Sequence, residues 1–282
     1  MKRISSIEYP QNPEIENKKL PAVSVFIFRH GETKTSEEDP KRRLIEEGEK
    51  QVDNLGDMIA QELGDPNQYI INPIDAENLR ARQSTDRVIE RLRRRGFDKY
   101  LQPIKIGKGG FTGKEELITS NQPRQHRTYA PLRRKIFTAE MTTPNGERAT
   151  LKDYYFKILQ DQGVEHPSVM QILQAWLTDE KPVKGIETPN DVKVFFQQAI
   201  EHANNDIPAL KEILPEGKSI VTIIGANNPK VDLLLETVTG MDRAKQEEEI
   251  VSNAEGCRVD FYPNQPPVFS VFGDKLEKKF SN

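Results

Sequence analysis

The most informative stretch of the chain is VFIFRHGETKT, residues 25–35, which begins as an apolar run and ends in a cation, an imidazole and a glycine. The run is β-branched and aromatic and apolar on both faces, as is typical of a strand inside a covered sheet. Ligands of open α/β sheets bind beyond the carboxyl ends of such strands. The sequence therefore predicts a strand over residues 22–30 with a ligand site at its end.

Arg29, His30 and Gly31 have a chemical rationale as a site that attacks phosphorus. A guanidinium presents five donors in a fork that matches phosphate oxygens. A neutral imidazole held in one tautomer can act as a nucleophile. Glycine lets the backbone approach a neighbour closely. A histidine at a strand end is more often structural, so the triplet needs support from the rest of the chain.

Outward from this stretch, apolar strands alternate with amphipathic helices. Further strands are predicted at residues 68–74, 101–107 and 218–226, with two antiparallel edge strands within residues 257–273. Helices are predicted at residues 44–63, 79–96, 187–203 and 228–240. Such alternation predicts an α/β fold, a three-layer α/β/α sandwich with a mostly parallel central sheet.

The length of 282 residues suits one large α/β domain. We predict that this domain spans residues 23–275, after an irregular extension at residues 1–22 and before a tail at residues 276–282. Residues 108–183 are polar and rich in glycine and proline at first, and helical from residue 151. This region is predicted to be a loop-rich and helical insertion that covers the site.

Composition excludes several classes of protein. A net charge of −3 and a pI near 6.0 give no bulk attraction to nucleic acid. The basic run at residues 90–96 is interpreted as a solvated last helical turn rather than a phosphate or RNA patch. Cys257, the single cysteine, is expected to be a small core residue. No segment has the apolar length of a signal peptide or a membrane span, so we expect a cytoplasmic protein without a membrane partner.

Two more motifs follow RHGET in order. The first reads L-I-E-E-G-E-K-Q and the second R-A-R-Q-S. Their key residues are Leu44, Ile45, Gly48 and Gln51, and then Arg80, Ala81, Gln83 and Ser84. This ordered set resembles the histidine phosphatase superfamily, the phosphoglycerate mutase-like proteins. The resemblance covers residues 23–107 and, more loosely, residues 183–240, where Glu187 matches the glutamate of a family helix start.

The resemblance implies a role for several residues. His30 would be the nucleophile and become a phosphohistidine, while Arg29 and Arg80 would grip the phosphoryl oxygens. Ser36 falls where many relatives have an asparagine that touches phosphate, and it could donate one bond. No metal or other cofactor is expected, because two guanidinium groups already neutralise the phosphoryl charge.

The chain departs from the family pattern in two places. Ala226 stands where the family has a second histidine that donates to the phosphoryl group, and Asn227 is the candidate to compensate. Losing one preorganised donor costs about 10²–10³ in rate. The general acid is expected after the third strand, where Glu115 and Glu116 are both candidates.

Two functions follow from these motifs and departures. The first is a phosphohydrolase acting on a phosphomonoester through phosphohistidine, with reduced activity. The alternative is a catalytically degenerate protein that binds a phosphorylated small molecule, a phosphopeptide or a protein partner. A mutase is less expected, because the basic and aromatic residues of mutases have no counterpart motif. The sequence leaves the oligomeric state open.

Overall fold

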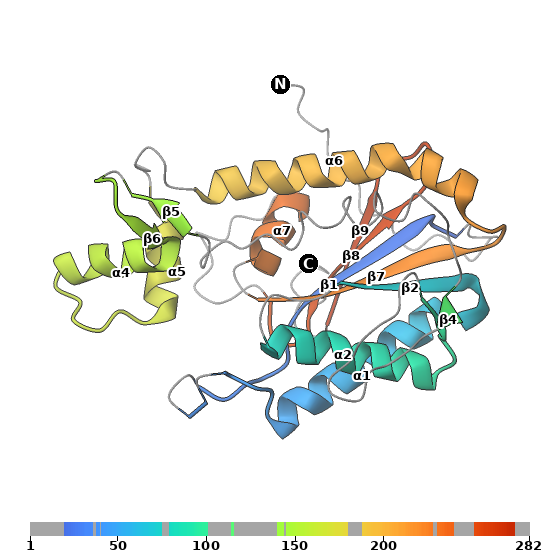
Figure 1. Ribbon diagram of the computed structural model, residues 1–282, viewed down its shortest axis with the longest axis horizontal. Coiled ribbons are helices and arrows are strands. Elements are labelled where there is room, and N and C mark those ends of the chain that lie inside the picture. The colour runs from blue at the N-terminus through green and yellow to red at the C-terminus, as the bar shows by residue number, and fades with distance from the viewer. Residues whose placement is uncertain are drawn as a thin grey trace.

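The computed structural model describes residues 20–35, 38–39, 41–74, 79–100, 114–115, 140–143, 145–179, 188–227, 230–239 and 251–273. A seven-stranded sheet in the order β4-β3-β2-β7-β1-β8-β9 forms its centre (Figure 1). The strands of this sheet are β1 (Val23–Arg29), β2 (Tyr69–Ile74), β3 (Lys99–Tyr100), β4 (Lys114–Glu115), β7 (Ser219–Ala226), β8 (Gly256–Phe261) and β9 (Val268–Phe272).

The sheet is mostly parallel, as predicted. β7 pairs in parallel with both β1 and β2, and the parallel pairing continues through β3 to β4. β8 and β9 are antiparallel and complete the other edge. β1 and β7 therefore lie in the interior of the sheet, which explains why both are apolar on both faces.

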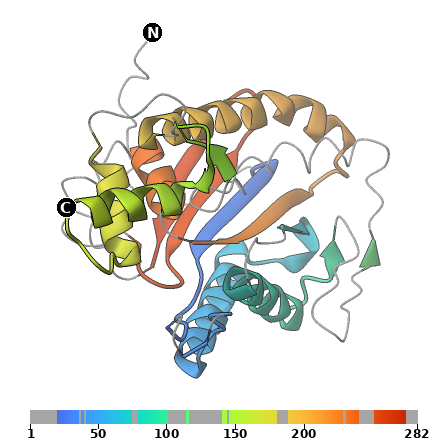
Figure 2. The same cartoon turned by 60° about the vertical axis from the view of Figure 1, so that its left-hand side comes forward.

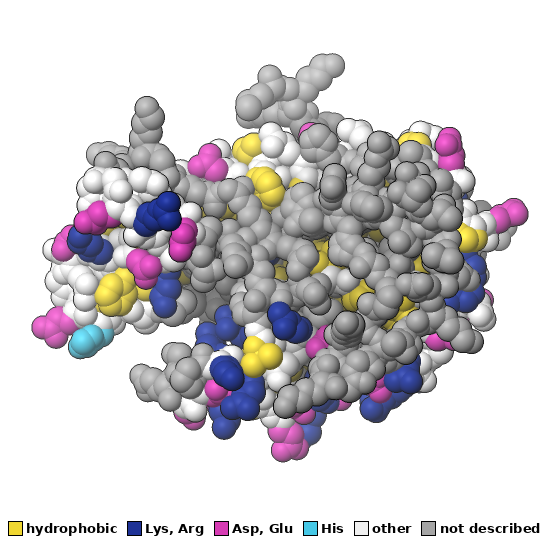
Figure 3. Space-filling model, in the orientation of Figure 1, with side chains coloured by type: hydrophobic (Ala, Val, Ile, Leu, Met, Phe, Trp, Pro, Cys, Tyr) yellow, Lys and Arg dark blue, Asp and Glu magenta, His cyan; other side chains and the backbone are white. Residues whose placement is uncertain are grey.

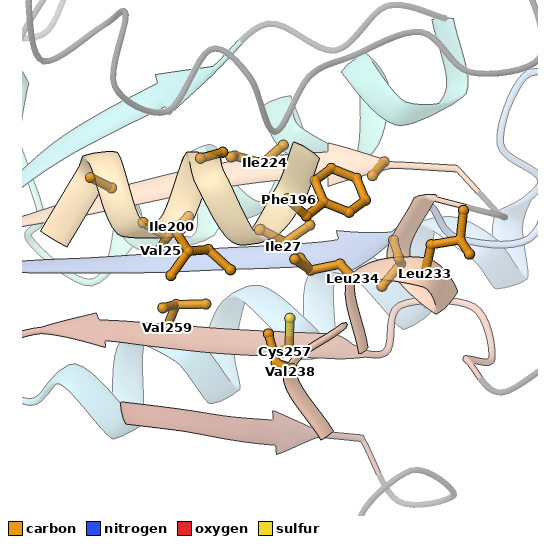
Figure 4. Close-up of a cluster of buried hydrophobic side chains, with 14 of the residues drawn as sticks. Val25, Ile27, Phe196, Ile200, Ile224, Leu233, Leu234, Val238, Cys257 and Val259 are labelled. Carbon is orange, nitrogen blue, oxygen red and sulfur yellow. The ribbon is translucent and has the colours of Figure 1, made fainter. Parts of the chain in front are cut away.

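Helices cover both faces of the sheet (Figures 1 and 2). The helices beside the sheet are α1 (Glu46–Leu63), α2 (Leu79–Arg94), α6 (Pro189–Ile213) and α7 (Lys230–Thr239). Phe26 and Phe28 of β1 belong to the core shared with α1 and α2. Val25 and Ile27 belong to the core shared with α6 and α7, shown in Figure 4. Side chains on a strand alternate between faces, so the two cores and the sheet form the predicted three-layer sandwich.

The expected insertion contributes β4 to the edge of the main sheet and four further described elements that lie beside this sheet (Figure 1). They are β5 (Glu140–Thr142), β6 (Arg148–Thr150), α4 (Leu151–Asp161) and α5 (Val169–Leu177). The two helices were predicted, and each begins with a capping box, at Thr150 and Ser168. The β5–β6 hairpin was not predicted, because three-residue polar strands have no alternating apolar pattern.

Helix α6 starts as predicted and ends later. Thr188 caps it, accepting the Asp191 backbone N–H, and Pro189 occupies the first turn. The helix continues through Pro208 to Ile213 instead of ending near residue 203. Ile207 and Leu210 are buried beyond the expected end, and this burial offsets the hydrogen bond that proline removes.

Other sequence expectations can be compared with the described part of the chain. The basic run at the end of α2 is exposed and ion-paired: Arg95 binds Asp57, and Arg94 binds Glu90. Cys257 is buried, and its burial raises the pKa of the thiol to about 12. None of the helices within the described ranges combines the length and apolarity that crossing a bilayer requires. The strand expected at residues 101–107 lies outside the described residues, and β3 ends just before it.

Candidate active site

The candidate site lies at the carboxyl end of β1, between β7 and β8. The backbone N–H of His30 donates to the Ala226 carbonyl at 3.0 Å, and that of Arg29 donates to the Glu255 carbonyl at 2.9 Å. The chain therefore leaves the sheet at His30 with its backbone held from both neighbouring segments. In the space-filling view, Lys and Arg side chains gather over the loop that follows β1 and the start of α2 (Figure 3).

The turn after His30 rests directly on the first turns of α1. A methyl group on Gly31 would lie 2.2 Å from the Gly48 carbonyl oxygen, and one on Gly48 would lie 2.0 Å from the Glu32 carbonyl oxygen. Gln51 accepts the Glu32 N–H at 3.0 Å. The glycine and glutamine of the first downstream motif thus hold this turn, which explains their spacing along one helix face.

Helix α2 is attached to the same turn by its second motif. The Ser84 hydroxyl accepts the Gly31 N–H at 3.2 Å and donates to the Arg80 carbonyl at 2.9 Å. Gln83 accepts the Leu44 N–H at 3.2 Å. Gln83 and Ser84, which follow Arg80 on α2, therefore position this arginine over the end of β1.

The start of α2 packs closely against β7, and this contact sets the distance between the helix and the sheet. A methyl group on Gly225 would lie 2.5 Å from the Ala81 carbonyl oxygen. The Thr85 hydroxyl accepts the Gly225 N–H at 2.9 Å and donates to the Ala81 carbonyl at 3.1 Å. The absence of a side chain at Gly225 lets the start of α2, and with it Arg80, approach the end of the sheet.

His30 and Arg80 meet in a direct hydrogen bond. The Arg80 Nε–H donates to His30 Nε2 at 2.8 Å, and His30 Nδ1 lies 2.7 Å from the Gly31 carbonyl oxygen. A carbonyl only accepts and a guanidinium only donates, so the network assigns the proton to Nδ1 and a lone pair to Nε2. The imidazole is thereby held in a single neutral tautomer.

The surroundings keep this imidazole neutral. Burial, together with the nearby charges of Arg80, Arg29 and Arg42, lowers the pKa of His30 to about 3, against the opposing effect of the Gly31 hydrogen bond. The side chain is only 5% exposed. The His30 imidazole is therefore neutral across the physiological pH range, inside a positively charged environment, and its Nε2 lone pair could act as a nucleophile.

Arginine charges gather around the imidazole. Burial, together with the charges of Arg42 and Arg29, lowers the pKa of Arg80 to about 10. Arg29 directs one guanidinium nitrogen to the Val251 carbonyl at 2.8 Å. The three site residues expected from the sequence therefore lie within electrostatic range of one another, and Arg42 joins them.

Arg42 is a site residue that the sequence reasoning missed. It lies in a polar loop, where a single arginine carries no signal. The available clue was its position two residues before Leu44, which belongs to the first downstream motif and is held by α2.

Comparisons with known proteins give structural likenesses only. No protein-family model matches the chain, and no curated protein matches it. One similar solved structure is the open reading frame Rv3214 from Mycobacterium tuberculosis, with 13% identity, a TM-score of 0.39, and coverage of 90% of this chain and 97% of that one.

Two further solved structures are similar to the chain. The mycobacterial glucosyl-3-phosphoglycerate phosphatase Rv2419c shows 12% identity and a TM-score of 0.43, covering 88% of this chain and 96% of that one. The protein TTHB049 from Thermus thermophilus shows 17% identity and a TM-score of 0.31, covering 88% and 99%. Likenesses this distant transfer neither a family nor an activity, so the chemistry has to be argued from this chain's own residues.

The sequence predicted that Ala226 stands in place of the family's second histidine and that Asn227 could compensate for it. Ala226 ends β7 with its side chain in the core shared with α6 and α7, and it is 3% exposed. Asn227 follows, and its carbonyl accepts the N–H of Lys230 at the start of α7. Its side-chain oxygen is buried without a hydrogen-bond partner among the described residues. Asn227 is therefore better placed than Ala226 to present a polar group at this end of the sheet.

The remaining predicted residues are not brought to the site within the described ranges. Ser36 and Glu116 lie outside the described residues. Glu115 ends β4, at the sheet edge. Four strand spacings separate β4 from β1, or roughly 19 Å, which is farther than a glutamate side chain reaches. This separation counts against Glu115 as the general acid, and a role for Glu116 stays a prediction.

Proposed function

We propose that the protein hydrolyses phosphomonoesters through a phosphohistidine formed on His30 Nε2. The observation that carries the proposal is the imidazole tautomer: the nitrogen nearest the arginine cluster holds a lone pair, and the other holds the proton. A neutral nucleophile among guanidinium groups suits attack on a phosphoryl group, because the cations stabilise its charge without protonating the attacking atom.

In the ligand-free protein the Nε2 lone pair accepts the Arg80 Nε–H. Phosphoryl oxygens are anionic and accept that N–H more strongly than a neutral nitrogen does. On binding, Arg80 would transfer its bond to the phosphoryl group and release the lone pair. Arg80 would thus couple substrate binding to exposure of the nucleophile.

The reaction then has two displacements. The Nε2 lone pair forms a bond to phosphorus while the bond from phosphorus to the ester oxygen breaks, and the leaving oxygen takes a proton from an acid or from water. The Nδ1–H bond to the Gly31 carbonyl stabilises the positive charge that the imidazole acquires. Water then attacks phosphorus, the phosphorus–nitrogen bond breaks, and orthophosphate leaves with neutral His30 restored.

We expect slow turnover. An aliphatic side chain at position 226 offers no donor to the phosphoryl group, and loss of one such donor costs about 10²–10³ in rate. The alternative function is binding of a phosphorylated small molecule or phosphopeptide without efficient turnover. The alanine at position 226 and the distance of Glu115 from β1 favour this alternative.

Hydrolysis of p-nitrophenyl phosphate tests the enzymatic proposal. The wild type should release nitrophenol slowly, and His30→Ala should abolish the release. His166→Ala, at an exposed histidine between α4 and α5, is the matched control and should keep the wild-type rate. Equal rates in the wild type and His30→Ala would refute the enzymatic proposal.

The binding alternative has a separate readout. Ligands that bind only the folded state raise the melting temperature. Millimolar phosphate or vanadate should therefore stabilise the wild type, whether or not it turns over. If neither anion changes the melting temperature, the site is not a phosphate site.

A further inference from the structure

Strand β9 (Val268–Phe272) forms one edge of the central sheet. It pairs with β8 on one side, and no strand in the described part of the chain pairs with its other side. An edge strand presents a row of backbone N–H and C=O groups that can pair with another chain. What β9 pairs with depends on how this edge is protected and on the side chains that it carries.

The β9 strand has none of the features that usually protect the edge of a sheet. Proteins blunt such edges with charged residues, proline, β-bulges or very short strands. The sequence of β9, VFSVF, has no charged residue and no proline, and its pairing with β8 runs from Val268 to Phe272 without a bulge. The strand at the opposite edge, β4, has only two residues, Lys114 and Glu115, and both are charged. β9 is therefore the edge better suited to extension by another strand.

Apolar side chains lie at this edge on both faces of the sheet. Val268 is 40% exposed, and Val194 of α6 is the other exposed large apolar side chain within the described ranges. On the opposite face, Phe269 and Val271 are half-buried against the core shared with α6 and α7. A strand added along β9 would remove apolar surface of all three β9 side chains from water, which favours association.

The sequence of β9 is complementary to itself in the antiparallel direction. If two copies pair with Ser270 opposite Ser270, each Val268 lies opposite Phe272 of the second copy. Each Phe269 then lies opposite Val271 of the second copy, so every aromatic residue faces a β-branched one, a favourable cross-strand pair. Serine, the smallest side chain of the strand, lies at the axis, where two identical side chains meet. Any other antiparallel register pairs fewer than the five residues of the strand.

A cavity beside β9 leaves room for side chains of an added strand. It has a volume of about 470 Å³ and lies between α1 and β9. A two-fold axis perpendicular to the sheet keeps each face of the second sheet on the same side. Val268 of the second copy would therefore lie on the α1 face, beside Phe272 and this cavity. The lining residues are Met58, Gln61 and Glu62 of α1 and Ser270, Val271 and Phe272 of β9.

We propose that β9 is a homodimer interface, at which the β9 strands of two copies pair in antiparallel orientation about a two-fold axis at Ser270. The two central sheets then form one continuous sheet. The partner that this edge fits is a second copy of the chain, because the same five residues supply both halves of each complementary pair. The inference does not depend on the chemistry at His30.

Disulfide crosslinking tests the register. Directly opposed residues of an antiparallel pair have Cα atoms about 4.5–5.5 Å apart, which is within the range that a disulfide spans. Ser270→Cys should therefore give a covalent dimer on mild oxidation with diamide. Val268→Cys is the matched control, because the two copies of residue 268 lie four residues apart along the pair, or about 13 Å, and it should crosslink at least about tenfold more slowly. The native Cys257 is buried, and burial raises the pKa of its thiol to about 12, so it does not compete.

Charges at the axis provide an independent test. Small interfaces associate weakly, so sedimentation velocity should cover protein concentrations of roughly 5–500 μM, where the wild type should dimerise. Ser270→Lys and Ser270→Glu should each weaken dimerisation about fivefold or more, because like charges then face each other. An equimolar mixture of the two variants should recover dimerisation, since the introduced ammonium group faces the introduced carboxylate. Val194→Lys, at the exposed valine of α6, is the control and should dimerise like the wild type.

Three results would overturn the proposal. The first is a wild type that stays monomeric over the whole concentration range, whatever else binds at β9. The second is a dimer that neither charged variant weakens, because it would use another surface. The third is equal crosslinking of Ser270→Cys and Val268→Cys, which would exclude the register. Circular dichroism of each variant shows whether it is folded, and if a charged variant is not, the two cysteine variants decide.

Discussion

One hydroxyl group links the helix that carries Arg80 to the centre of the sheet. The Thr85 hydroxyl accepts the Gly225 N–H at 2.9 Å, and both residues are buried. Thr85→Val keeps the shape of the side chain but removes the acceptor. The Gly225 N–H would then be buried without a partner, whereas the Ala81 carbonyl would keep its place in the helix ladder of α2.

The cost follows from that one lost acceptor. A buried backbone donor without a partner destabilises a protein by about 1–3 kcal/mol. For a domain of this size, the melting temperature should fall by about 2–12 °C. The start of α2 should also loosen from β7, so Arg80 should hold an anion less well and phosphate should stabilise the variant less than it stabilises the wild type.

Urea unfolding followed by circular dichroism measures the stability, and thermal unfolding with and without phosphate measures the anion effect. Thr85→Ser is the matched control, because it keeps the hydroxyl and removes only a methyl group. The valine variant should be less stable than the serine variant. If the two variants unfold at the same urea concentration, or serine is the less stable, the hydroxyl is not what fastens α2 to β7.

Two further predictions concern the histidine and the turn that follows it. Because the folded state holds the pKa of His30 near 3, below its ordinary value of 6.5, the unfolded chain binds the extra proton between these values. This contribution to stability is therefore present above about pH 6.5 and is lost as the pH falls towards 3, with a slope of up to about 1.4 kcal/mol per pH unit. His30→Gln should flatten that part of the curve in denaturant titrations at several pH values, and an unchanged slope would contradict the assigned burial. Gly48→Ala should destabilise the protein by about 1–3 kcal/mol or more and abolish phosphate binding, because the new methyl group would meet the Glu32 carbonyl oxygen at 2.0 Å. If this variant keeps wild-type stability and still binds phosphate, the turn is not held against α1.

Much of the site was predictable from local patterns. The apolar run before Arg29 predicted an interior strand, and parallel strands present their carboxyl ends on one edge. Gly48 and Gln51 were singled out as parts of one motif at the start of a predicted helix, and the structure shows that these two residues carry the turn after His30. The capped start of α6 was also readable, since the Thr188–Asp191 capping box depends only on residues three apart.

Other features depended on contacts between distant segments. The sequence placed Glu115 after a third strand, but only the strand order shows that β4 lies at the far edge from β1. Alternation along β7 directs the Ala226 side chain into the core rather than to the site. The extension of α6 through Pro208 required the burial of Ile207 and Leu210, which no local rule for proline includes.

The sequence by itself determined the interior strands and the starts of the helices that cover them, and that His30 ends an interior strand between motifs able to hold its turn. Only the tertiary structure decided which charges meet there. Arg42 and Arg80 are 38 positions apart and share no periodic pattern, yet the pairing of Leu44 with Gln83 brings them together. The periodicity of a segment encodes the face that it buries. The electric field at a site is instead the sum over charged side chains, and packing and strand order decide which of these lie close together.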